Sequence, residues 1–141
     1  MAAFKLKMAM DSTNSDETMF LFNKTSQLNY DANVDGAYFA GYGLINLSGI
    51  SKDGQNVSVY NLPYTSGMAI GLNADAKADG KYLFKISYAR KIPANVQIWI
   101  KDTFLKDSVN VRKGNYSFSI SKADTNTFGS KRFKLIIKSK S

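Results

Sequence analysis

The sequence contains no cysteine and no histidine, and its only glutamate is Glu17. The lack of cysteine and histidine excludes disulfide bonds, zinc fingers, thiolate nucleophiles and imidazole bases. A glycosidase needs two carboxylates that face each other across a cleft, whereas Glu17 lies beside Asp16 in a polar segment. Pairs of aspartates could supply such carboxylates, but a domain of this size with two packed sheets leaves little room for a cleft. The sequence therefore predicts a protein that is not an enzyme.

Long apolar runs are also missing. No segment approaches the roughly 18 consecutive apolar residues of a membrane-spanning helix, so we expect no membrane span. Residues 1–7 lack the continuous apolar stretch of a signal peptide. The chain is therefore expected to be either a cytosolic protein or a piece of an exported one. The lack of cysteine is compatible with both.

What the chain does contain suits a single domain spanning residues 1–141, long enough to bury a core. Apolar and polar residues alternate in residues 4–10, 57–60, 68–72, 82–88, 96–101, 116–120 and 132–138, and residues 18–23 and 44–48 are less regular. Strict alternation predicts strands with one buried and one solvated face. Glycine next to Asp, Asn or Ser separates several of these segments, as turns require. We expect an all-β domain of roughly nine antiparallel strands, packed as a jelly-roll-like β-sandwich, with a closed barrel as the alternative.

The net charge of +8 is unevenly distributed. Residues 1–80 carry five Lys against eight Asp and Glu, whereas residues 81–141 carry fourteen Lys and Arg against three Asp. Such asymmetry indicates either an anionic partner or a surface kept soluble by lysine. Arg132, Lys134 and Lys138 are predicted to share one solvated face, where they either bind an anion or protect a sheet edge from aggregation. No recognition helix or RNA-stacking platform is evident, so no nucleic-acid partner is expected.

An acidic segment offers a candidate metal site. Asp31, Asn33 and Asp35 place side-chain oxygens at alternate positions before Gly36, as at the start of a calcium-binding loop. The complete motif needs a bidentate Glu at its twelfth position, which is Tyr42 here. Asp and Asn also favour turns by bonding their own backbone. Calcium binding and a simple turn therefore remain alternatives, and no other cofactor is predicted.

Trp99 is the main candidate for ligand contact. Its neighbours Ile98 and Ile100 take the buried face, so Trp99 should point to the other face together with Gln97 and Lys101. An exposed aromatic ring beside hydrogen-bonding groups is typical of sugar-binding sandwiches. The alternative is that a loop or a neighbouring domain covers the ring. The irregular segment 24–43, which contains four aromatic residues, is a second candidate contact region.

The order of several segments resembles a known family. These segments are DETMFLFN at residues 16–23, YD at 30–31, DGAY at 35–38, VSVYNLP at 57–63, VQIWIKD at 96–102, YSFS at 116–119 and RFKL at 132–135. They resemble the β-sandwich domains that precede the type IX secretion sorting domain in large surface proteins of Bacteroidetes, and the similarity covers residues 4–137. The resemblance implies an exported, non-catalytic, jelly-roll-like domain at the cell surface, with the neighbouring domains of a larger chain as partners. It carries over no binding residues, and it favours a structural role for Asp31 and Asp35.

Two functions are therefore expected from the sequence. The first is a non-catalytic structural or adhesion module of a larger exported bacterial protein, located outside the cell. The second is a carbohydrate-binding module that contacts a surface glycan through Trp99, with the 24–43 segment as a further contact.

Overall fold

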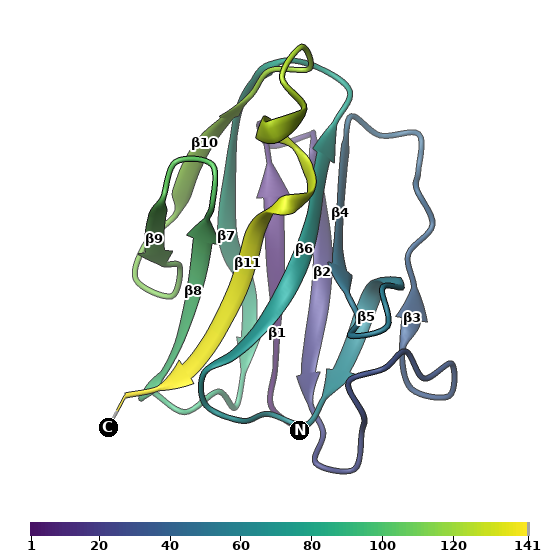
Figure 1. The fold of residues 1–141 in the computed structure, drawn as a ribbon. Coiled ribbons are helices and arrows are strands. Elements are labelled where there is room, and N and C mark those ends of the chain that lie inside the picture. The colour runs from purple at the N-terminus through teal and green to yellow at the C-terminus, as the bar shows by residue number, and fades with distance from the viewer. Residues whose placement is uncertain (141) are drawn as a thin grey trace.

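The computed structural model describes residues 1–140, which form eleven strands and one short 3₁₀ turn (Figure 1). The strands are β1 (Ala3–Ala9), β2 (Ser15–Phe22), β3 (Gly36–Ala37), β4 (Ile45–Ile50), β5 (Asn56–Leu62), β6 (Met68–Ala76), β7 (Gly80–Arg90), β8 (Val96–Asp102), β9 (Asp107–Asn110), β10 (Tyr116–Ile120) and β11 (Gly129–Ser139). The 3₁₀ turn, η1, spans Thr125–Thr127. The prediction of an all-β domain is confirmed. Two short strands, β3 and β9, account for the excess over the nine expected.

The strands form one mixed sheet in the order β10-β7-β1-β2-β5-β4-β6-β11-β8-β9, and β3 pairs with β5 beside this path. Every pair is antiparallel except β2 and β5, which run parallel from Met19 opposite Val59 to Phe22 opposite Leu62. The expectation of a purely antiparallel sheet is therefore wrong at this pair. The reason is the long connection that leaves β2 and contains β3 and β4, since a parallel pair requires a crossover of this kind.

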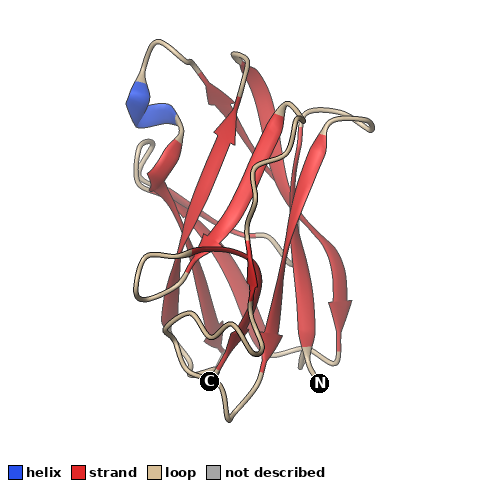
Figure 2. Ribbon diagram, turned by 90° about the vertical axis from the view of Figure 1, so that its right-hand side faces the viewer, coloured by secondary structure: helices blue, strands red, loops and turns tan. Residues whose placement is uncertain are grey.

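The sheet curls until it is almost closed and barrel-like. In Figure 1, β6, β8 and β11 lie in front of β1, β2 and β7, and Figure 2 shows the same strands from the side. The end strand β10 is linked to β8, which lies next to the other end strand β9, by a hydrogen bond of 2.6 Å from the Tyr116 hydroxyl to Asp102 Oδ2. All the strands of residues 1–140 pair within one sheet, so the expected sandwich is not confirmed.

Alternating residues of opposite strands fill the interior. Phe84 on β7 and Phe118 on β10 stack with ring centroids 4.8 Å apart, and both rings contact Phe133 on β11 at 4.9 and 4.7 Å. These three buried rings join the front and back of the curled sheet. Fully burying one such side chain contributes about 1.5–3 kcal/mol, so this cluster is a large part of the core.

Arg132 departs from the predicted pattern. Alternation places it on the solvated face with Lys134 and Lys138, but its side chain is buried beside that of Phe133. The pairing of β11 with β6 shifts register between Gly129 and Phe133, and an irregularity of this kind re-aims side chains. The prediction of an exposed Arg132 is wrong for this reason.

The start of β1 and the end of β11 lie at the same end of the molecule (Figures 1 and 2). Within residues 1–140, none of the helical structure is long and apolar enough to cross a lipid bilayer.

Candidate functional site

The structure brings the three predicted contact residues together on the outer face of β8. Val96, Ile98 and Ile100 are buried, whereas Gln97 and Trp99 are half-buried and Lys101 is exposed. Trp99 therefore points away from the core, as the alternation predicts. The indole ring is half-buried, so part of it remains accessible to solvent.

Two neighbours fix the position of the Trp99 ring. Its Nε1–H donates to Oε1 of Gln97 at 3.0 Å. The ammonium group of Lys138, on the adjacent strand β11, lies 5.0 Å from the ring centroid, within range of a cation–π interaction. The ring is thus held in one orientation by Gln97 and Lys138, and it is half-buried.

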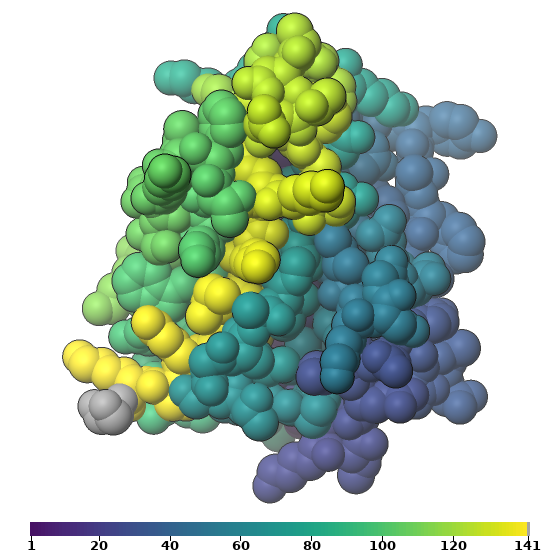
Figure 3. All heavy atoms as spheres, viewed as in Figure 1, coloured from purple at the N-terminus to yellow at the C-terminus, as the bar shows by residue number. Residues whose placement is uncertain are grey.

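Strand register places further side chains around Trp99. Across the sheet, Trp99 lies opposite Ile136 on β11, and Ile136 lies opposite Ala69 on β6. Lys101 lies opposite Lys134 on one side of this row, and Gln97 lies opposite Lys138 on the other. We name this surface the Trp99 face; it consists of Gln97, Trp99, Lys101, Lys134, Ile136, Lys138 and Ala69. Figure 3 shows the side of the molecule where β11, in yellow, is flanked by β8 and β6.

Sequence reasoning missed Ile136 and Ala69 as members of this surface. Both lie on strands far from Trp99 in the sequence, and their proximity depends on the order β6-β11-β8. Only the alternation around Leu135 and Ile137 indicated that Ile136 faces solvent. The identity of the neighbouring strands was the missing information.

The predicted calcium ligands form a tight turn instead of an open ring of oxygens. Asp35 is 8% exposed, and its carboxylate accepts hydrogen bonds from the backbone N–H of Asn61 at 2.7 Å and of Asp31 at 2.9 Å. The Asp31 carboxylate accepts from the backbone N–H of Asn33 at 2.9 Å. Backbone donors thus occupy oxygens that a cation would need. Over residues 1–140, no three His, Cys, Asp or Glu residues gather closely enough to hold a metal ion.

The long segment 24–43 lies away from Trp99 itself, although Leu28 lines a hollow together with Ala69. It connects β2 to β4, and β4 is separated from β8 by β6 and β11 in the sheet (Figure 1). Tyr38 anchors the segment, because its hydroxyl donates to Asp16 Oδ2 at 2.6 Å. Burial and this hydrogen bond raise the pKa of Tyr38. Phe39 and Tyr42 are 85% and fully exposed, and they precede β4, which β6 and β11 separate from β8.

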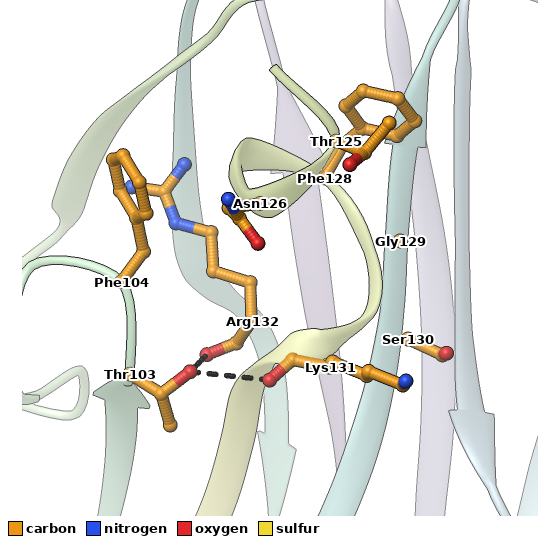
Figure 4. Close-up of a pocket in the computed structure, with 9 residues that line it drawn as sticks. All are labelled: Thr103, Phe104, Thr125, Asn126, Phe128, Gly129, Ser130, Lys131 and Arg132. Carbon is orange, nitrogen blue, oxygen red and sulfur yellow. Dashed lines mark hydrogen bonds between the residues drawn. The ribbon is translucent and has the colours of Figure 1, made fainter.

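A hollow of about 650 Å³ lies next to η1, between the turn after β8 and the start of β11 (Figure 4). Phe104, Asn126 and Arg132 are among its lining residues. The Arg132 guanidinium is already engaged by the protein, through Asp102 and through the carbonyl oxygens of Ser119 and Thr127, each at 2.8 Å from Nη1. The hollow therefore offers no free cationic group from this arginine.

Comparison with known protein families, with curated proteins and with solved structures gave no match.

Proposed function

We propose that this chain is a non-catalytic adhesion module of a larger exported bacterial protein and that it binds carbohydrate through the Trp99 face. The observation that carries the proposal is the orientation of Trp99, which points outward from β8 with its Nε1–H held by Gln97. A pyranose ring has an apolar face of C–H groups that packs against an aromatic ring, and its hydroxyls need polar partners nearby. Gln97 and Lys101 supply such partners.

The location outside the cell is supported by the resemblance to domains that precede a type IX sorting domain. The same resemblance supports a jelly-roll-like description of the curled sheet, whose front and back strands face each other across one core. Neighbouring domains of the parent protein would then be its covalent partners. A purely structural spacer is the competing function, and it requires no ligand on the Trp99 face.

Intrinsic fluorescence provides a direct test, because Trp99 is the only tryptophan in the chain. The wild-type protein is screened on a glycan array, and each bound glycan is then titrated while the Trp99 emission is recorded. We expect a saturable change in emission and the loss of array binding in Trp99→Ala. Tyr42→Ala is the matched control, because Tyr42 is a fully exposed aromatic residue away from β8.

The two functions predict opposite results. A spacer binds no glycan and shows constant Trp99 emission at every sugar concentration, which would overturn the proposal. Equal loss of binding in Trp99→Ala and Tyr42→Ala would also contradict it, since the contact would then not be specific to the Trp99 face.

A further inference from the structure

The lysines of the Trp99 face are not explained by protection of a sheet edge. Exposed lysine is common on edge strands, where it blocks pairing with other molecules. Lys134 and Lys138 lie on β11, which is flanked by β6 and β8, and Lys101 lies on β8, which is flanked by β11 and β9. Neither strand is an edge. Two explanations then remain for three exposed lysines on this surface, namely solubility and an anionic ligand.

These lysines also lack acidic partners. Lys101 and Lys134 are directly opposite each other, an arrangement that is destabilising for like charges. Within residues 1–140 the ion pairs are Lys122–Asp75 and Arg132–Asp102, so neither Lys101 nor Lys134 is paired with a carboxylate. The flanking positions on β9 that pair with Lys101 and Trp99 are Ser108 and Asn110, which are uncharged. The Trp99 face is thus uniformly basic, and a bound anion would relieve the cost.

The apolar residues of the Trp99 face lie in a row that runs across the strands. Trp99, Ile136 and Ala69 form a row across three neighbouring strands, and Lys101 with Lys134 flank it on one side while Lys138 flanks it on the other. Adjacent strands are about 4.8 Å apart, so the row is about 10 Å long. Ala69 and Gly71 also line a hollow of about 210 Å³ with Leu28, Ile50 and Lys52, which extends the row beyond β6.

We infer that the ligand of the Trp99 face is an acidic polysaccharide that lies across the strands, an inference that rests on the proposed carbohydrate function. Its sugar rings pack along Trp99, Ile136 and Ala69, and the Lys138 ammonium moves from the Trp99 ring to a carboxylate or sulfate group of the ligand. Lys101 and Lys134 bind such groups on the opposite side of the row. Charge complementarity selects this ligand, because every charged side chain of the surface is a lysine. The surface has an apolar row with lysines on both sides. An acidic polysaccharide has the complementary groups, because its sugar rings have apolar faces and its anionic groups are regularly spaced.

Matched polymers test the charge of the ligand. The intact protein is titrated with dextran sulfate and with neutral dextran, and with polygalacturonate and its fully methyl-esterified form. We expect Lys101→Gln combined with Lys134→Gln to weaken binding of the acidic polymers by about tenfold or more, the size expected when charged hydrogen bonds are lost. Lys24→Gln combined with Lys81→Gln is the control, since both of these exposed lysines lie off the Trp99 face and the net charge falls equally.

A pair of substitutions at Ala69 tests the direction of the chain. Ala69 is exposed at the β6 end of the row, so both variants should fold. Ala69→Glu is expected to weaken acidic polymers, whereas Ala69→Lys, of similar size, is expected to retain or strengthen them. Equal weakening by both would indicate steric contact without charge recognition and would overturn the inference.

The remaining outcomes separate this inference from the proposed function. If neutral and acidic polymers bind equally and only Trp99→Ala abolishes binding, the carbohydrate function stands and the acidic ligand is wrong. If no polymer or glycan binds, the carbohydrate function fails and the inference fails with it. The inference is overturned if the control double variant loses as much affinity as the test variant. It is also overturned if DNA or phosphatidylserine vesicles bind through Lys101 and Lys134 as tightly as the acidic polysaccharides do. In either case, the protein attracts polyanions in general.

Discussion

The guanidinium of Arg132 and the carboxylate of Asp102 form a two-point ion pair in the interior, with Nε–Oδ1 at 3.0 Å and Nη2–Oδ2 at 2.9 Å. Both side chains are almost completely buried, at 1% and 0% exposure. The same carboxylate accepts a hydrogen bond from Tyr116 at 2.6 Å. The pair therefore connects β8, β10 and β11, where the two ends of the curled sheet approach each other.

Removing one member of this pair should destabilise the domain strongly. Asp102→Asn leaves the Arg132 charge buried without a counter-charge, and such a loss costs about 3–5 kcal/mol. Replacing both residues, with Asp102→Leu and Arg132→Met, should cost less than the single change because no unpaired charge remains. Urea unfolding measures each free energy, with Asp107→Asn as the exposed control. A double variant less stable than Asp102→Asn would contradict this account.

Acid should weaken the same connection. Burial raises the pKa of the Asp102 carboxyl, but hydrogen bonds from Arg132, Tyr116 and the backbone of Leu105 outweigh this effect and hold the pKa below its ordinary value. A carboxyl with a lowered folded-state pKa adds stability above its unfolded pKa of about 3.9, and that stability is lost as pH falls through the folded value. The free energy of unfolding of wild type should therefore fall more steeply below about pH 4 than that of Asp102→Asn. Parallel curves would show that Asp102 does not titrate in this way.

We expect the stability of the turn at residues 31–35 to come from its hydrogen bonds and not from bound calcium. Asp35→Ala leaves the buried backbone N–H of Asn61 without its acceptor, and an unsatisfied group of this kind costs about 1–3 kcal/mol. The thermal midpoint of wild type should be the same in EDTA and in millimolar calcium, because only a bound ligand raises it. A midpoint that rises with calcium in wild type, but not in Asp35→Asn, would establish the metal site predicted as the alternative.

The stability of the domain should be sensitive to substitution of Gly129, which lies at the register shift that turns Arg132 inward. This glycine has a φ of +99°, a conformation that costs other residues about 1–2 kcal/mol. No atom lies close to the position of an added Cβ, so the cost of Gly129→Ala would come from the backbone alone. Gly114→Ala, also free of close contacts but without a positive φ, should be nearly neutral. Calorimetric melting of both variants checks the difference, and equal melting temperatures would contradict it.

Alternation in the sequence predicted which residues face the core but not which strands are neighbours. Phe84, Phe118 and Phe133 were identifiable as buried because each sits in a strictly alternating segment. Their contact with one another depends on the curling of the sheet, which involves residues far apart in the sequence. The direction of Trp99 followed from the same local pattern, whereas Ile136 and Ala69 joined its surface only through strand order.

Two further features could not be predicted from local sequence patterns. β9, with the sequence Asp-Ser-Val-Asn, has little strand propensity and forms because it pairs with β8. Arg132 lies inside because of a register shift in β11, which the regular spacing of Phe133, Leu135 and Ile137 conceals. In both cases a tertiary contact overrides the local preference.

The position of the two chain ends bears on how the domain would respond to tension. The start of β1 and the end of β11 lie at the same end of the molecule, so a force applied through flanking segments pulls on both strands from that end. The hydrogen bonds between strands are perpendicular to the strand direction. A pull from one end therefore breaks these hydrogen bonds one after another, whereas a pull from opposite ends would strain them all at once. We therefore expect a domain of this geometry to unfold at a lower force than one whose terminal strands are pulled from opposite ends.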